Sequence, residues 1–450
     1  MARSAQVVGV AMALFVGGAL EAQVPVLGSA QVTQRTLSSG LSLVVKEERQ
    51  WPVVSLGVFI RAGSLYEEPG QEGAAHLLEH MLFEMTGDGG GKLAPEIEAL
   101  GGRLTATTMR DFVQLNVTVA SRYLEEVLPL VTRTVFETRL DEQALRREIE
   151  VVKREMAERE ERADLYLIDT LWGLAFREHP YGRPIGGSPD EVERLSVETL
   201  ESFRSDRYAP SNVSMIAVGD VEAPWLAGRL AELTDRYKRD ASEWVPPSVE
   251  APPTTPRIIT AQIDRDVSLL GFAWHAPSIA DKTDVCALDL IYTLLGAGAS
   301  GRLRRVLVDE RRVALSVDTQ FLTQKEPGLF IINALVPQGR EQEAQTFILD
   351  EVRRLSEAPP SDAELDQAKR LLYADYAFAN ESSDEQVGSM GFYESIDSYR
   401  FALDYVASVM AVTSSQVQES ARKYLRAESY SLVVLQAASG GGPADLGVQL

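Results

Sequence analysis

The sequence predicts an α+β protein with two structurally similar domains, because one local pattern occurs twice and a proline-rich segment separates the two copies. In each copy a helical segment is followed by an apolar, strand-like run. The two units are residues 198–208 with 213–218, and residues 415–425 with 430–435. Further strand-like runs, at 53–60 and 329–336, alternate with longer helical patterns. We therefore expect a duplicated fold in which each copy is an antiparallel-rich mixed sheet with helices packed on one side.

The domain boundaries follow from chain length and from the distribution of proline. Prolines cluster between residues 245 and 256, and since proline cannot donate to a sheet ladder and disfavours helix, this stretch is expected to be extended. The predicted organisation is an N-terminal domain over 30–240, a linker over 241–257 and a C-terminal domain over 258–440. Each domain then has roughly 200 residues, a usual size for a separate hydrophobic core.

The N-terminus predicts export. Arg3 precedes an apolar run over residues 7–20, and small residues around Ala22 provide a cleavage position. This pattern indicates a secretory signal peptide over residues 1–22. The run is shorter than the ~20 residues that span a bilayer, so an uncleaved membrane anchor is the alternative. The single cysteine, Cys286, excludes an intrachain disulfide framework, and export without disulfides predicts a bacterial periplasmic protein.

Composition excludes several functional classes. The 450 residues are 45% hydrophobic and 24% charged, as in an ordinary globular protein. The formal net charge of −22 argues against nucleic acid as a partner. Beyond a possible uncleaved signal anchor, we expect no membrane association.

The motif H-x-x-E-H carries most of the functional information. His76 and His80 are four residues apart in the apolar run 74–83, with Glu79 between them. On a helix this spacing places both imidazoles on one face, so that they can bind one metal ion. Glu79 lies at the edge of that face, where its carboxylate can accept a proton from a zinc-activated water. The alternative is a buried amphipathic helix with two hydrogen-bonded histidines.

A catalytic zinc usually has three protein ligands and one open position, so a third ligand is expected elsewhere. The candidate is Glu155, in a segment without proline or glycine that reads as a helix. Glu148 is seven residues earlier, two turns along the same face, where it can orient a metal ligand from behind. The competing interpretation of this acidic segment is a solvated, charged helix face.

These motifs resemble those of the inverzincin peptidases of the pitrilysin and mitochondrial processing peptidase family, in the bacterial short-chain form. In that family a glutamate ligand follows H-x-x-E-H by some 75 residues, and Glu155 follows His80 by 75. Residues 148–155 resemble the family segment E-R-x-V-V-x-x-E, with Ile149 where arginine is usual. The resemblance implies one Zn²⁺ per chain, bound by His76, His80 and Glu155, with Glu79 as general base and Glu148 supporting a ligand.

Two further segments extend the resemblance. Residues 101–111 resemble the glycine-led strand G-x-x-N-A-x-T-x-x-D that borders the family's cleft, and 179–182 resemble another recurrent segment, H-P-Y-G. By resemblance, Leu104, Thr105 and Ala106 contact the substrate backbone, although Thr105 stands where asparagine is common. The expected architecture is a half-chamber in which a peptide adds as a strand to a sheet edge. Enclosure then favours short or unfolded peptides.

The C-terminal copy lacks two groups that the resemblance leads us to expect. Residues 300–316 resemble a family segment whose arginine and tyrosine, seven residues apart, hold the scissile carbonyl; here those positions are Val308 and Leu315. Neither side chain can donate a hydrogen bond. A shifted register offers Arg305 and Arg312, but then no tyrosine follows. The remaining histidines outside the motif, His179 and His275, are expected to be structural.

The resulting functional prediction is a zinc-dependent metalloendopeptidase subunit that acts on peptides or unfolded segments. Since the arginine and tyrosine are missing, we expect a homologous, zinc-less partner to supply them in a heterodimer. The alternative is a non-proteolytic peptide-binding or assembly subunit of the same fold.

Overall fold

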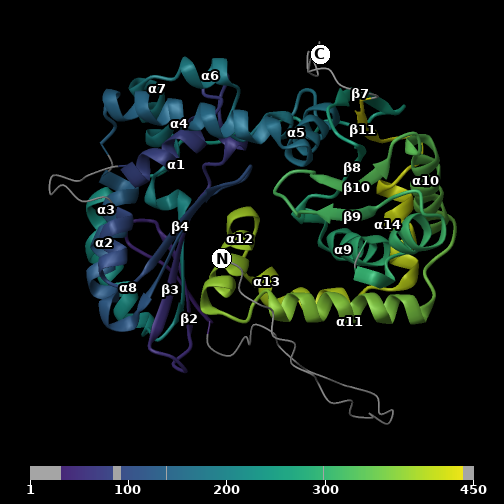
Figure 1. Cartoon of the computed structure of the whole chain (residues 1–450). Helices are drawn as coiled ribbons and strands as arrows, with labels where there is room; N and C mark the ends of the chain where they lie inside the picture. Colours follow the sequence, from purple (N-terminus) through teal and green to yellow (C-terminus); the bar gives the residue numbers. More distant parts are fainter. Residues whose placement is uncertain (1–31, 85–92, 138, 297, 439–450) are drawn as a thin grey trace, which may run out of the picture.

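The computed structural model describes residues 32–84, 93–137, 139–296 and 298–438, which form two halves side by side, each a sheet with packed helices (Figure 1). The predicted signal peptide, residues 1–22, lies outside the described residues. Among the helices that are described, none combines the length and the apolar character needed to cross a bilayer.

The first half is built on a six-stranded mixed sheet, sheet A. Its strands are β1 (Val32–Thr36), β2 (Ser42–Glu47), β3 (Val53–Ile60), β4 (Arg103–Thr108), β5 (Val113–Ala120) and β6 (Val213–Gly219). Their order across the sheet is β1-β2-β6-β3-β5-β4. The pair β2–β6 is parallel and all other pairs are antiparallel. As a result, β4 is an edge strand, and β5 is the only described strand that pairs with it.

The second half repeats this arrangement in a five-stranded sheet, sheet B. Its strands are β7 (Arg257–Ile263), β8 (Val267–His275), β9 (Ser316–Phe321), β10 (Leu329–Pro337) and β11 (Ser431–Ala437). Their order is β7-β11-β8-β10-β9, with β7–β11 parallel and the other pairs antiparallel. Without β1, sheet A has the same order of strands along the chain. The predicted duplicated α+β fold is confirmed.

The duplication extends to single residues in equivalent strands. Gly57 is the fifth residue of β3 and pairs with Asn116 of β5, while Gly271 is the fifth residue of β8 and pairs with Asn333 of β10. Both glycines face a helix at close range, as described below.

Helices surround both sheets. Those of the first half are α1 (Ala74–Glu84), α2 (Leu93–Ala99), α3 (Leu124–Glu137), α4 (Glu142–Glu161), α5 (Ala163–Ala175), α6 (Pro189–Glu193), α7 (Val197–Arg207) and α8 (Ala223–Thr234). Those of the second half are α9 (Lys282–Gly296), α10 (Glu341–Glu357), α11 (Asp362–Phe378), α12 (Ser383–Ile396), α13 (Arg400–Ala411) and α14 (Ser414–Tyr424), with a π-helix at Arg304–Glu310.

Local sequence signals account for several helix starts. The side chains of Ser361, Ser382 and Thr413 form capping boxes at the N-termini of α11, α12 and α14, which satisfies backbone N–H groups that have no partner within the helix. Asp141 caps α4 by accepting a hydrogen bond from the backbone N–H of Gln143.

The two halves exchange one helix each. α12 packs on β3 and β6 of sheet A, and α5 packs on β7, β8 and β11 of sheet B (Figure 1). A Cβ atom on Gly57 would lie 2.4 Å from Val387 of α12, and one on Gly271 would lie 3.1 Å from Leu167 of α5. The glycines thus let a helix from the opposite half approach the sheet closely. Each sheet therefore has its own helices on one face and a helix from the other copy on the second face.

The segment between the sheets, residues 238–256, contains neither helix nor strand. It is nevertheless fixed to the first half through Glu250, whose carboxylate accepts hydrogen bonds from the backbone N–H groups of Arg177, Glu178 and His179 at 3.1, 2.8 and 3.1 Å. Burial raises the pKa of Glu250, but these three bonds and a hydrogen bond from the Arg257 side chain together hold the pKa below its ordinary value.

Candidate metal centre

Helix α1 presents the H-x-x-E-H motif, and buried contacts fix its first turn. The Glu67 carboxylate accepts a hydrogen bond from the backbone N–H of Ala75 at 2.9 Å. Gly73, just before α1, has a φ of +87°, and a Cβ atom there would lie 2.4 Å from the carbonyl oxygen of Gly186. Only glycine fits this close approach without strain. The loop around Gly186 therefore determines where the first turn of α1 begins.

The side chains of His76, His80 and Glu155 converge. His80 Nε2 lies 3.4 Å and His76 Nε2 3.9 Å from Glu155 Oε2, and one ligand atom from each residue lies within 4.8 Å of the others. Ligand atoms about 2.1 Å from a tetrahedral zinc ion are roughly 3.4 Å apart. Within the described residues, this is the only such group of His, Cys, Asp and Glu.

Glu148 lies behind the cluster, where it can orient His80. Its Oε2 is 3.2 Å from His80 Nδ1, and its side chain is only 9% exposed. A carboxylate at Nδ1 fixes the proton on that nitrogen and leaves Nε2 free to bind a metal. The side chain of Glu155 is 48% exposed, so the cluster opens to solvent on the side of α4.

His76 is in the form that metal binding requires. Burial, with a smaller contribution from the charge of His80, lowers the pKa of His76 to about 4, so its imidazole is neutral at pH 7. Its Nδ1 is buried without a hydrogen-bond partner, and a Cβ atom on Gly186 would lie 3.2 Å from it. Two histidines and one carboxylate are a common donor set for catalytic zinc, and the residues present fit this metal.

Glu79 is held by a residue that the sequence analysis did not identify. The hydroxyl of Thr108, the last residue of β4, donates to Glu79 Oε2 at 2.6 Å in a buried environment. Burial raises the pKa of Glu79, whereas hydrogen bonds from Thr108 and the charge of His80 oppose the shift.

The residues expected to contact substrate all lie on β4. Leu104, Thr105 and Ala106 pair with Val117, Asn116 and Leu115 of β5. β5 is the only strand that pairs with β4 in the part of the chain that the structure describes, so the other edge of β4 has no strand partner there. Such an edge can accept an extended peptide as an added strand, and β4 ends at Thr108 beside Glu79.

In the second half, Val308 lies in the π-helix, partly buried against the second core, and Leu315 is 53% exposed just before β9. The two remaining histidines make structural contacts, as expected. His275 Nε2 lies 3.0 Å from the carbonyl oxygen of Ala175, and His179 Nδ1 accepts a hydrogen bond from the backbone N–H of Tyr181.

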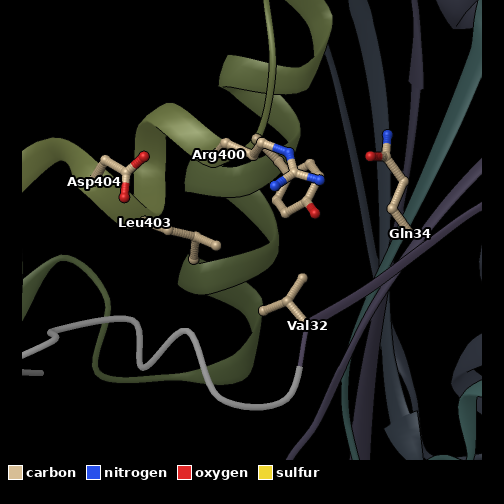
Figure 2. A pocket seen from close by; sticks show the side chains of 6 residues that line it. Val32, Gln34, Arg400, Leu403 and Asp404 are labelled. Atoms are coloured by element: carbon tan, nitrogen blue, oxygen red, sulfur yellow. The ribbon is translucent and has the colours of Figure 1, made fainter.

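A hollow elsewhere on the surface involves none of these residues. It lies between β1 and the start of α13 (Figure 2). Its lining consists of Val32, Gln34, Tyr399, Arg400, Leu403 and Asp404. This lining has no histidine and one carboxylate, so it does not resemble a metal site.

Comparisons with known proteins identify the family of the chain. The sequence profile of insulinase (peptidase family M16) matches residues 43–188, and that of the peptidase M16 inactive domain matches residues 194–372. The chain belongs to peptidase family M16. The resemblance to the pitrilysin and processing peptidase family is thereby confirmed.

Relatives and solved structures cover nearly the whole M16 chain. It is 26% identical over 414 residues to a probable mitochondrial-processing peptidase subunit beta of Arabidopsis thaliana, covering 89% of this chain and 77% of the relative. It is 25% identical over 408 residues to the zinc protease PqqE of Helicobacter pylori, with coverages of 89% and 92%. These names support a zinc metallopeptidase.

Two crystal structures share the fold. A protease from Helicobacter pylori has a TM-score of 0.82 at 24% identity, covering 90% of this chain and 99% of the other. A peptidase M16 inactive domain from Pseudomonas fluorescens has a TM-score of 0.83 at 21% identity, with coverages of 92% and 100%.

Proposed function

We propose that this chain is the zinc-bearing subunit of an endopeptidase that hydrolyses short or unfolded peptides. The observation that carries the proposal is the convergence of His76, His80 and Glu155 beside Glu79. The proposed stoichiometry is one Zn²⁺ per chain. This donor set, with a carboxylate next to it and an open strand edge alongside, combines the groups needed for peptide hydrolysis.

Each residue of the site has a separate role in this mechanism. Bound zinc would polarise the scissile carbonyl and increase the acidity of water. Glu79 accepts a proton from the attacking water and later donates it to the leaving amine. Thr108 holds the Glu79 carboxylate, Glu148 orients His80, and the backbone of Leu104, Thr105 and Ala106 aligns the peptide beside them. No covalent intermediate between enzyme and substrate is required.

We further propose that a homologous, zinc-less partner supplies the arginine and tyrosine in trans, because Val308 and Leu315 cannot stabilise a developing oxyanion. A missing donor of this kind typically costs a few kcal/mol of transition-state stabilisation. The isolated chain should then hydrolyse an unstructured peptide slowly, and the partner should restore turnover. Full turnover by the purified chain alone would contradict the partner proposal while leaving the zinc site intact.

The direct test of the chemistry is Glu79→Gln, which removes the base and keeps the size of the side chain. We expect one zinc per chain by elemental analysis and no hydrolysis of an internally quenched, unstructured peptide. His76→Ala serves as the matched variant and should lose both metal and activity. Hydrolysis by Glu79→Gln at the wild-type rate would remove Glu79 from the mechanism.

The absent Arg/Tyr pair also favours a second candidate, a peptide-binding or assembly subunit without hydrolysis. It predicts stoichiometric zinc and peptide binding, but no turnover even in the presence of a co-purified partner. For location, we propose the periplasm on the basis of the N-terminal sequence, and comparing the N-terminus of the protein from cells with the encoded sequence tests cleavage after Ala22.

A further inference from the structure

The base is positioned by the end of a strand rather than by its own helix. Thr108 donates its hydroxyl to Glu79, and it is the last residue of β4. The chain then turns sharply through Met109–Phe112, closed by a 2.8 Å hydrogen bond from the backbone N–H of Met109 to the carbonyl of Phe112. The turn therefore begins at the residue directly after Thr108.

Two consecutive side chains of the turn are bound to Tyr181, in the 3₁₀ helix Pro180–Gly182. The Tyr181 hydroxyl donates to Asp111 Oδ1 at 2.5 Å, and Arg110 Nε donates to the Tyr181 carbonyl at 3.0 Å. Tyr181 and Asp111 are 0% and 3% exposed. The Arg110 guanidinium lies 3.8 Å from the centre of the Trp172 ring. The turn is thus fixed from the side of α5.

The second half of the chain contacts the same pair. The backbone N–H of Lys325 donates to Asp111 Oδ2 at 3.3 Å, and that of Glu326 donates to the Tyr181 hydroxyl at 3.1 Å. Both residues lie in the loop between β9 and β10. Asp111 and Tyr181 therefore join the active-site turn to a loop of the half that carries no zinc motif.

The interdomain segment supports this junction as well. The three N–H groups that bind Glu250 belong to residues 177–179, which precede the 3₁₀ helix of Tyr181. A carboxylate that accepts three backbone N–H bonds fixes the local chain direction. The segment 238–256 thus fixes residues 177–179, while the loop of Lys325 contacts Tyr181 itself.

From these contacts we infer that Asp111 and Tyr181 are positioning residues for the general base: the zinc-free half holds the β4–β5 turn through them, and the turn holds Glu79 through Thr108. This inference rests on the proposed function of Glu79. Through these hydrogen bonds, changes in loops of the second half can alter the turnover number without altering metal binding, although these loops bear no catalytic group.

The competing explanation is that the pair only stabilises the interface between the halves. The two explanations differ in how substitutions combine. If Tyr181 acts through Thr108, replacing both residues should have no larger effect on turnover than replacing Thr108 alone, whereas independent contributions to stability should add.

The test uses Tyr181→Phe, which removes the hydroxyl and keeps the ring. Tyr405→Phe is the matched control, because Tyr405 also donates a buried hydroxyl to a carboxylate, Asp289, at 2.9 Å, but within the second core. Measured on an unstructured peptide with the chain co-purified with its partner, Tyr181→Phe should lower kcat by about 10- to 100-fold, with KM within about twofold. Tyr405→Phe should leave both within about twofold.

Substitutions of Thr108 complete a double-mutant cycle with Tyr181 and test whether a hydroxyl alone restores kcat. Thr108→Val should lower kcat as much as Tyr181→Phe or more, and Thr108→Ser should restore most of it because the hydroxyl remains. Tyr181→Phe added to Thr108→Val should change kcat by less than about twofold. Multiplicative losses in the double variant, or a loss of zinc in Tyr181→Phe, would overturn the inference.

A readout without turnover separates this inference from the proposed function. In the full-length chain alone, amide hydrogen exchange at Thr108 and Met109 should accelerate in Tyr181→Phe and stay unchanged in Tyr405→Phe. If wild type shows no Glu79-dependent hydrolysis, the proposed function fails, and selective loss of protection in Tyr181→Phe still supports the coupling of the turn. Equal protection in both variants would refute that coupling.

Discussion

Two glycines in α12 make opposite stability predictions, although they are three residues apart on the same helix. A Cβ atom on Gly391 would lie 2.0 Å from two ring atoms of Phe59, which is buried in β3, whereas one on Gly388 would meet nothing within 4 Å. Gly388→Ala should stabilise the protein by about 0.5–1 kcal/mol, because alanine is more favourable than glycine in the interior of a helix. Gly391→Ala gains the same propensity but should lose about 1–3 kcal/mol through overpacking, since carbon atoms normally approach to about 3.5–4 Å.

Because both variants gain the same helix propensity, the predicted difference between them is the overpacking loss of about 1–3 kcal/mol. Urea denaturation followed by circular dichroism measures it, with Gly388→Ala above wild type and Gly391→Ala below. The contact tested joins a helix of the second half to a sheet of the first. If Gly391→Ala proves as stable as Gly388→Ala, α12 does not pack on sheet A as described, and the exchange of helices is wrong.

Three other predictions concern the metal, the backbone conformation of Arg312 and the carboxylate of Glu250. Chelation of zinc should lower the melting temperature of wild type and leave that of His76→Ala unchanged, because only a folded site binds the ion. Arg312 has a φ of 53°, so Arg312→Gly should stabilise by about 0.5–1 kcal/mol in chemical denaturation; a loss of stability would contradict this. The pKa of Glu250 is lowered in the folded state, so its contribution is present above the ordinary glutamate pKa and is lost as the pH falls. Glu250→Gln should cost about 1–2 kcal/mol at pH 7, and its urea midpoint should converge with that of wild type as the pH falls below the ordinary glutamate pKa.

Local periodicity was sufficient for the parts of the site that lie on one helix. His76 and His80 are four residues apart, and α1 places their rings 4.8 Å from centre to centre. Glu155 is 75 residues away, and no local rule links it to them; the family resemblance suggested it, and the packing of α4 on α1 brings it there. The assignment of these residues as ligands remains a prediction.

The residues missed by the sequence analysis act through tertiary contacts. Thr108 and Asp111 lie within the glycine-led segment, and Tyr181 lies within the H-P-Y-G segment. Neither pattern predicts the contact between Asp111 and Tyr181. A threonine at a strand end is expected on β propensity alone, so its hydrogen bond to Glu79 has no signature of its own. The sequence analysis did not predict the close approach of α5 and α12 to the opposite sheets. Gly57 and Gly271 could have indicated it, because a glycine inside a strand often marks a close approach of another element.

The helix exchange limits how the molecule can move. The sheet faces covered by the exchanged helices share their hydrophobic cores with the opposite half. Phe59 and Ile216 of sheet A belong to the second core, and Val433 and Leu435 of sheet B belong to the first. Swinging the halves apart would strip both faces of apolar cover at roughly 25 cal/mol for each Å² exposed. The proline-rich segment consequently connects the two halves without acting as a hinge. The fold therefore disfavours admission of substrate by separation of the two halves.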